Sequence, residues 1–409
     1  MTYKRKSLLI KIIVLAFAAL IALFPLEDSP SLETKTAVNV IAFDKQGEST
    51  QIFVQMNIPQ QMAQGSSKLL VVEEEGNNIA EAFEKLSIKI GQEIELAHCG
   101  IIIIGEDMAH KGFVDDLNYL LAGGMISPQI TIFNCEGNAE DFMSTLNKFS
   151  QTNGSAIFDV VKFSEKSINL RTVTALTFLA ENNLPSNAST LPLIDFEIQE
   201  GDGSQGGYDS GESQNSSGNS GQGSTSSEQS ENESPELKEL NMSMVYKNGI
   251  AVGKISEKGT KGISIFDEKS NKGYLEVSDV KVGEDVISYV PMQVRKKRGV
   301  LKAEFREGKP IITAEIDVML EIETSFNISK VGKNISQKEV KEAIADKIRQ
   351  IMQSEIEEAL ELSRKFDADI LGIQNAFYKQ QYTQYKFYAS KDEIVKNVQV
   401  EYKINADVT

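Results

Sequence analysis

The chain has 409 residues, of which 41% are hydrophobic and 25% are charged, values close to those of ordinary globular proteins. Because domains usually span about 100–200 residues, this length predicts two or three of them. Lys and Arg number 42 against 59 Asp and Glu, which gives a net charge of −17. That charge repels phosphate backbones, so we expect no nucleic-acid partner.

The first thirty residues have the pattern of a signal peptide or membrane anchor. Lys4, Arg5 and Lys6 precede a mainly apolar stretch at 7–26 that is broken by Lys11. The uninterrupted part is shorter than the ~20 residues that span a bilayer, so cleavage and retention are both open at this point. A poor cleavage site at the end of the stretch favours an uncleaved anchor. Basic residues before it predict that the remaining chain lies outside the membrane.

Composition divides the chain into four parts. Residues 201–236 consist almost entirely of Gly, Ser, Gln, Asn, Glu and Asp, a composition that cannot form a packed core. We therefore predict a signal or anchor segment at 1–30, an N-terminal domain at 31–200, a disordered acidic linker at 201–236 and a C-terminal domain at 237–409.

The N-terminal domain alternates strand and helix patterns. A turn-rich tetrapeptide at 44–47 lies between two β-prone runs, which predicts a hairpin. The apolar run at 101–104 has no polar alternation, which predicts a strand buried on both faces. Further patterns predict a helix after Asn77 and Asn78, either of which can cap its first turn, helices around 113–121 and at 139–149, and a buried strand at 129–135. This order predicts an α/β domain in which helices cover a sheet.

The C-terminal domain has longer elements. Asn248-Gly249 predicts a hairpin, because both residues tolerate positive φ. Apolar and polar residues alternate at 312–322 and again at 398–404, which predicts strands with one buried face. Ser336 and Glu339 form a capping-box pattern at the start of a long amphipathic helix. An antiparallel sheet with this helix on its apolar face would bury both patterns, so we predict an α+β fold.

Residues with catalytic or metal-binding chemistry are few. Cys99 and Cys135 lie in apolar runs, which favours buried, unpaired thiols over a disulfide. His98 and Cys99 are neighbours on an expected strand, so their side chains would point to opposite faces. The acidic clusters at 73–75 and 355–361 have the pattern of solvated loop and helix faces. With no phosphate-binding loop or zinc-ligand spacing in the sequence, we expect no enzyme activity, cofactor or metal.

Acidic and aromatic residues are concentrated after the long helix. From this segment we select a candidate interaction surface, which consists of Asp367, Asp369, Phe377, Tyr378 and Tyr382. The alternative interpretation is that these residues end the helix and pack the second core.

Motifs in the same region resemble those of a known family. The long helix is followed by Ala368-Asp369-Ile370-Leu371-Gly372 and then by Ala376-Phe377-Tyr378. Supporting stretches lie at 91–108 and 244–253 and in Gly259-Thr260-Lys261-Gly262. On these residues the chain resembles the Ger(x)C family, the C subunits of the nutrient germinant receptors of bacterial spores. The order of elements is similar over almost the whole chain outside the linker.

The resemblance implies a non-enzymatic subunit that lies outside the inner spore membrane. Its implied partners are the membrane and the multi-pass membrane proteins of the A- and B-subunit type, with which it would help convert a nutrient signal into germination. Family members typically carry an acylated lipobox cysteine, and a Trp-Asp pair commonly follows it. This sequence has no cysteine near residue 25 and no tryptophan. A hypothesis of a different class is a membrane-anchored solute-binding protein or cell-envelope hydrolase, which would need a concave polar pocket.

Overall fold

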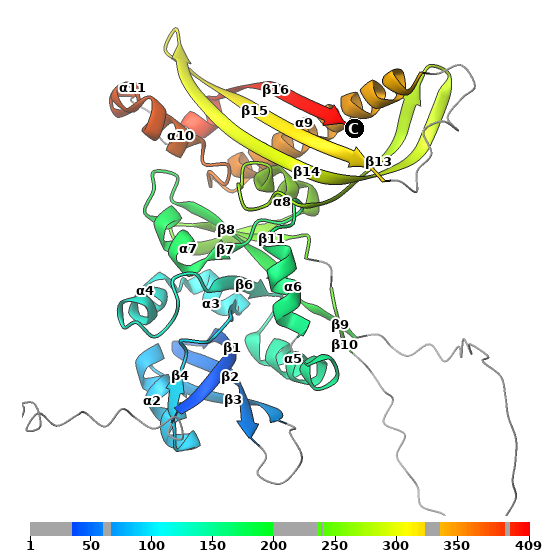
Figure 1. Cartoon of the computed structure of the whole chain (residues 1–409). Helices are drawn as coiled ribbons and strands as arrows, with labels where there is room; N and C mark the ends of the chain where they lie inside the picture. The colour runs from blue at the N-terminus through cyan, green and yellow to red at the C-terminus, as the bar shows by residue number, and fades with distance from the viewer. Residues whose placement is uncertain are drawn as a thin grey trace, which may run out of the picture.

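The computed structural model describes residues 35–59, 67–154, 156–198, 235–238, 240–323, 336–388 and 393–409. The predicted anchor at 1–30 and nearly all of the predicted linker at 201–236 lie outside these residues. Within them, no helix is both long enough and apolar enough to cross a membrane. Figure 1 shows a large sheet built mainly from the N-terminal half and a four-stranded sheet above it, and a separate pair of short strands lies beside the large sheet.

The first half of the chain forms strands and helices in alternation. The strands are β1 Lys35–Gln46, β2 Ser49–Pro59, β3 Ser67–Gly76, β4 Glu93–Glu95, β5 Ile101–Ile104, β6 Thr131–Cys135, β7 Val173–Thr174, β8 Ala188–Ile194 and β9 Phe196–Ile198. The helices are α2 Ile79–Ile90, α3 Glu106–Lys111, α4 Val114–Ala122, α5 Ala139–Asn153, α6 Ala156–Ser164 and α7 Ala175–Asn182. The predicted hairpin is therefore β1 and β2, and the predicted helix after Asn78 is α2, whose first turn Asn78 caps.

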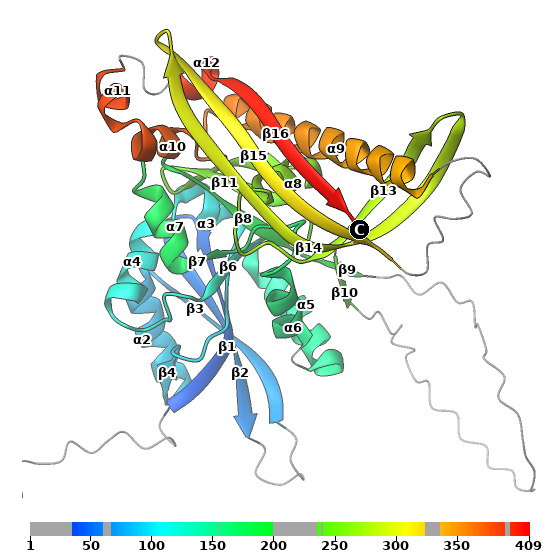
Figure 2. The same cartoon turned by 45° about the horizontal axis from the view of Figure 1, so that its top comes forward.

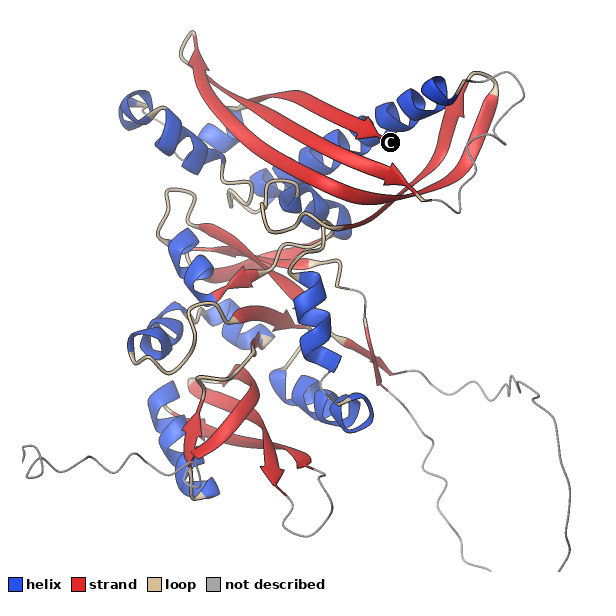
Figure 3. Ribbon diagram, viewed as in Figure 1, coloured by secondary structure: helices blue, strands red, loops and turns tan. Residues whose placement is uncertain are grey.

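Helices cover both faces of the first sheet, as the α/β prediction requires (Figure 3). Along β5, Ile102 and Ile104 contact the core under α2, α4 and α7, whereas Ile101 and Ile103 contact the core under α5 and α6. The strand is thus buried on both faces, as predicted. The acidic cluster at 73–75 was expected in a loop, but it lies in β3 at the edge of the sheet, where exposed charges oppose pairing with another chain.

The second half of the chain supplies the remaining elements. The strands are β10 Pro235–Leu237, β11 Ser243–Lys247, β12 Ile250–Ile255, β13 Gly273–Val282, β14 Asp285–Arg306, β15 Lys309–Ile322 and β16 Gln399–Val408. The helices are α8 Glu257–Ser264, α9 Gln337–Lys365, α10 Ile373–Gln380, α11 Tyr382–Phe387 and α12 Ile394–Asn397. The predicted capping box of Ser336 and Glu339 opens α9, and Phe366 is its C-cap.

The hairpin of β11 and β12 turns at Asn248 and Gly249, which have φ of 51° and 77°. The sequence prediction placed it in the C-terminal domain at 237–409. In the structure β11 pairs antiparallel with β8, so the hairpin extends the first sheet to the order β12-β11-β8-β6-β5-β1-β2-β3. Alternation within a hairpin does not specify the edge with which it pairs, because that choice depends on distant residues.

The second sheet has the order β13-β14-β15-β16, and α9 lies along one face (Figure 2). The prediction of a purely antiparallel sheet is wrong, because β16 runs parallel to β15. Helices α9 to α12 connect these two strands, and parallel neighbours require such a long crossover connection. The sheet is therefore mixed, while the predicted contact between one apolar sheet face and the long helix is confirmed.

The two short strands that flank residues 199–234 lie side by side. Ile198 of β9 pairs with Pro235 of β10 in an antiparallel register. A short turn can therefore connect β9 to β10 in place of the residues between them. We expect replacement of residues 201–232 by Gly-Asn-Gly to change the melting temperature by less than about 2 °C, because a segment of this composition is not expected to contribute to a packed core. Differential scanning calorimetry of the two proteins measures this, and a drop of about 8 °C or more would refute it.

Candidate functional site

The carboxyl ends of β1, β5 and β6 meet where α3 and α5 begin, a position that often binds ligands in α/β sheets. Here Asp44 fills the position with its own carboxylate. It accepts hydrogen bonds from the backbone N–H groups of Met108, at 3.2 Å, and Ala139, at 2.8 Å. The carboxylate fits there because residue 105 is glycine: a Cβ at Gly105 would overlap the Asp44 carboxylate. Burial raises the pKa of Asp44, and the backbone hydrogen bonds oppose that rise.

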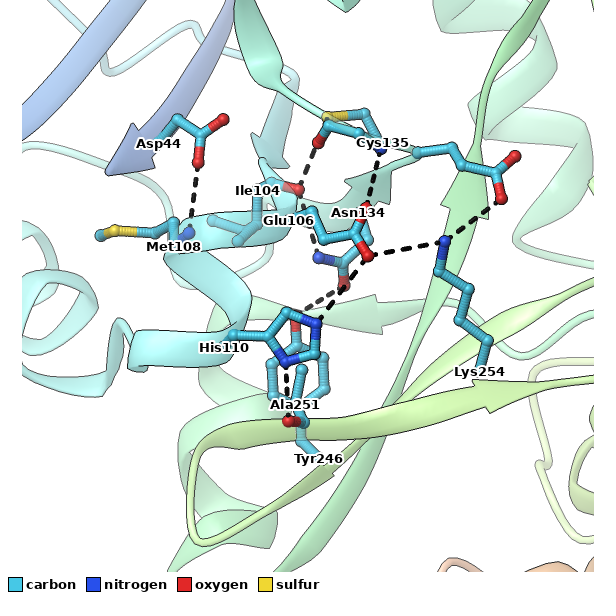
Figure 4. A network of polar contacts seen from close by, with 12 residues as sticks. Asp44, Ile104, Glu106, Met108, His110, Asn134, Cys135, Tyr246, Ala251 and Lys254 are labelled. Carbon is cyan, nitrogen blue, oxygen red and sulfur yellow. Dashed lines mark hydrogen bonds and ion pairs between the residues drawn. The ribbon is translucent and has the colours of Figure 1, made fainter. Parts of the chain in front are cut away.

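Polar contacts near Asp44 join the β11–β12 hairpin to the first sheet (Figure 4). The buried Tyr246 hydroxyl donates to Asn134 Oδ1 at 2.7 Å, and Asn134 Nδ2 donates to the carbonyl of Ile104 at 3.2 Å. His110 Nδ1 lies 3.2 Å from the carbonyl oxygen of Ala251. Nearer the surface, Lys254 forms an ion pair with Glu136 at 3.2 Å. These contacts have a structural role, because each connects elements that are distant in sequence.

The cysteines and histidines do not converge on one site. Cys99 and Cys135 are free and buried, as predicted, and burial raises the pKa of both thiols. His98 is exposed and lies in the turn before β5, not on the strand that the sequence suggested. The described residues hold no cluster of three or more His, Cys, Asp or Glu side chains with the geometry of a metal site.

Two members of the candidate interaction surface are core residues. Asp369 is 4% exposed, and its carboxylate accepts from the backbone N–H groups of Ile373, at 2.9 Å, and Gln374, at 2.6 Å. Phe377 is 0% exposed and packs on Phe305, with ring centroids 4.8 Å apart. The alternative reading of the sequence therefore holds for these two residues, which cap and anchor α10.

The other three members remain at the surface. Asp367 is exposed, has φ of 51°, and forms ion pairs with Lys247 and Lys396. Tyr378 and Tyr382 are 41% and 53% exposed and meet edge to face, with centroids 5.3 Å apart. Phe387, which the prediction did not include, is 79% exposed at the end of α11. We call Tyr378, Tyr382 and Phe387 the aromatic surface.

The motif that precedes α10 lies at the junction between the two sheets. Ala368 and Ile370 share a buried cluster with Ala188 of β8 and Val245 of β11. Asn375 adds two hydrogen bonds across the same junction, because its Oδ1 accepts from the Ser186 N–H at 3.0 Å and its Nδ2 donates to the Ser186 hydroxyl at 2.8 Å. The motif thus holds the C-terminal helices against the first sheet.

The glycine motif of α8 forms the other half of this junction. A Cβ at Gly262 would overlap the backbone carbonyl of Glu355, and one at Gly259 would lie 2.6 Å from Leu362 Cδ1. A Cβ at Gly253, on β12, would overlap the ring of Phe366. Glycine at these positions allows α8 and β12 to lie directly against α9 and its C-terminal end.

Asp369 gives the junction a measurable pH dependence. Burial raises its pKa from 3.8 to about 6, against the hydrogen bonds that favour the charged form. The folded state therefore binds the proton more tightly than the unfolded state, and stability falls as pH rises from about 4 to 6. Relative to Asp369→Asn, the parent protein should lose roughly 2–3 kcal/mol of unfolding free energy between pH 3.5 and 7. Urea denaturation across this range measures the difference.

Asp367→Asn serves as the control for that measurement. Its partners Lys247 and Lys396 lower the pKa of Asp367, so its contribution to stability is present above about pH 4 and lost at lower pH. Relative to the parent, Asp369→Asn should therefore change the stability profile mainly between about pH 4 and 6, and Asp367→Asn should change it in the opposite sense and only near or below about pH 4. Identical profiles for both variants would contradict the assignment of Asp369 as a buried carboxylate at the junction.

The fold and the site define a protein of two packed halves with an α/β core, a close interdomain junction and an exposed aromatic surface. The chain belongs to the Ger(x)C family of spore germination proteins, because two family models match it in succession. The model described as "Spore germination protein N-terminal domain" matches residues 28–196. The model described as "Spore germination B3/ GerAC like, C-terminal" matches residues 241–409. The resemblance that the motifs indicated is thus confirmed.

A solved structure has a similar fold. It is titled "Crystal Structure of the GerBC protein", and it aligns with a TM-score of 0.50 at 14% sequence identity. The alignment covers 90% of this chain and 96% of that chain. At this identity the similarity concerns the fold. No curated protein matches the chain.

Proposed function

We propose that this protein is a non-enzymatic, extracytoplasmic subunit of a membrane germinant-receptor complex that supports nutrient-triggered spore germination. The observation that carries the proposal is the match of both halves of the chain, in order, to spore germination family models. The N-terminal segment would hold the protein at the outer face of the inner spore membrane. Its partners would be multi-pass membrane proteins of the A- and B-subunit type.

The aromatic surface supports a role in protein contacts. Tyrosine is enriched at the energetic centres of protein interfaces, because it buries a large area with little loss of conformational entropy. Phe387 is a large side chain with most of its area in solvent, and α10 beneath the surface is fixed to the core by Asp369 and Phe377. The helix that carries Tyr378 is therefore held in place, while the three aromatic side chains are exposed to solvent. Exposed aromatic side chains on a fixed helix suit docking to a partner subunit.

The position of Asp44 supports this proposal over the alternative of a solute-binding protein or hydrolase. In an α/β sheet those functions often use the crevice at the carboxyl ends of the strands. At this position the chain's own carboxylate takes the backbone N–H groups of Met108 and Ala139 that a bound anion would otherwise use.

Germination of spores tests the proposed function. Spores that lack this gene should respond to the nutrient mixture used by their receptor with at least a tenfold slower loss of optical density. Spore yield and heat resistance should match the parent, because the proposed role begins after spore formation. Restoring the gene should restore the rate. A deletion strain whose spores respond normally to every nutrient tested would remove the proposal.

A further inference from the structure

A hollow of about 600 Å³ lies at the side of the junction, between α6 and the start of β13. Its lysines come from both halves of the chain, with Lys162 and Lys166 from the first and Lys272 from the second. A second hollow of about 530 Å³ shares Lys166 and Lys272 and adds Lys269. We call the two hollows together the lysine groove.

The lining of the lysine groove is rich in positive charge. The first hollow has three lysines and no carboxylate among its lining residues, in a chain whose net charge is −17. The second has one carboxylate, Glu165, whose Oε1 accepts a hydrogen bond from the Thr131 hydroxyl at 3.1 Å. None of the four groove lysines forms an ion pair with a described residue.

The backbone beneath the groove is fixed. Lys272 N–H donates to the carbonyl of Lys166, and Ile168 N–H donates to the carbonyl of Lys272, both at 2.9 Å. The Ser270 hydroxyl donates to the carbonyl of Leu170 at 2.9 Å. These bonds join the loop after α6 to the loop before β13. The like charges are therefore held near one another by the fold itself, which raises the local positive potential.

Apolar side chains flank the charges. Phe163 is 78% exposed and Tyr274 is 58% exposed, and both line the first hollow. Exposed aromatic rings beside unpaired cations suit a ligand that has carboxylates and apolar side chains together. Because the lysines are distributed along two adjoining hollows, a ligand with several spaced carboxylates matches them better than one small anion does.

From these observations we propose that the lysine groove binds an acidic peptide segment of a partner protein. This contact would be separate from the one at the aromatic surface. An extended segment with several Asp or Glu residues and an aromatic residue would place its carboxylates at the lysines and its ring beside Phe163 and Tyr274. Since both halves of the chain contribute lysines, such a segment would bind across the junction.

The test uses the full-length chain in detergent and a fluorescein-labelled peptide in which Glu alternates with Ser around a central Phe. Fluorescence anisotropy measures the dissociation constant. We compare the parent with the triple variant Lys162→Gln, Lys166→Gln, Lys272→Gln. The matched control is Lys281→Gln, Lys309→Gln, Lys338→Gln, three exposed lysines outside the groove that change the net charge equally. Melting temperatures establish that all three proteins are folded.

The groove variant should bind the peptide at least tenfold more weakly than the parent, and the control should bind within twofold of it. Phe163→Ser should weaken binding about threefold or more. Equal weakening in the groove variant and the control would overturn the proposal, because it would mean general attraction to positive charge. The proposal would also be overturned if polyphosphate displaced the peptide and Phe163→Ser left the affinity for the peptide unchanged, because the groove would then be a site for any polyanion. A tenfold gain in peptide affinity when residues 201–232 are replaced would instead assign the groove to the chain's own acidic segment.

Discussion

Replacing Gly262 by alanine should lower the unfolding free energy by about 2–3 kcal/mol, because the new methyl group would overlap the carbonyl of Glu355 on α9. The sign is diagnostic. In a helix without such a contact, alanine is more favourable than glycine by about 1 kcal/mol. Close packing of α8 on α9 has to outweigh that preference for the variant to be destabilised. Urea denaturation, monitored by tyrosine fluorescence and circular dichroism, measures the change.

Lys258→Ala is the control in the same helix. Lys258 is exposed, and its ion pair with Glu358 has a distance of 3.9 Å. Its loss should change the unfolding free energy by less than about 0.5 kcal/mol. If Gly262→Ala were neutral or stabilising, the glycine motif would have another role, and the account of the junction would be wrong.

Replacing Asp44 by alanine should lower the unfolding free energy by about 2–4 kcal/mol. The change leaves the buried N–H groups of Met108 and Ala139 without their acceptor, at the starts of two different helices. Removal of a buried carboxylate with a raised pKa offsets part of this loss. Asp44→Asn, which keeps one side-chain acceptor, should lose about half as much. Thermal and urea denaturation at pH 7 measure both variants.

Asp107→Ala provides the comparison for Asp44. Asp107 lies in the first turn of α3, beside Met108, whose N–H donates to Asp44. The side chain of Asp107 is exposed. Its loss should remove a favourable interaction with the helix dipole, about 0.3–1 kcal/mol, and also relieve its repulsion of the Asp44 carboxylate, so the net effect should be small. Similar effects of the two variants would mean that Asp44 acts through charge alone and does not satisfy the helix termini.

Local patterns predicted individual elements well. The turn at Asn248-Gly249, the capping box of Ser336 and the buried strand at 101–104 all appear as expected, because each depends on residues close in sequence. The parallel pairing of β16 was missed, although a signal for it was available. That signal is the long helical connection between the two strands, which is typical of parallel neighbours.

The candidate site was predictable only in part. Tyr378 and Tyr382 are exposed, as a surface requires, but Asp369 and Phe377 are buried. Asp369 lies four residues after the end of α9, and such an aspartate is expected to be polar and exposed unless its backbone partners are known. Those partners come into place only when the chain turns at Gly372. The lysine groove could not be predicted, because Lys166 and Lys272 are joined by tertiary hydrogen bonds.

Co-purification with partner subunits tests the proposed role in a receptor complex. The protein would carry an affinity tag at Thr409 and be isolated from detergent-solubilised membranes of dormant spores, alongside the variant Tyr378→Ser, Tyr382→Ser, Phe387→Ser. We expect the parent to recover multi-pass membrane proteins of the A- and B-subunit type. We expect the variant, with an unchanged melting temperature, to recover at least fivefold less of them. Recovery of no multi-pass membrane protein with the parent chain would contradict the proposed role in a receptor complex.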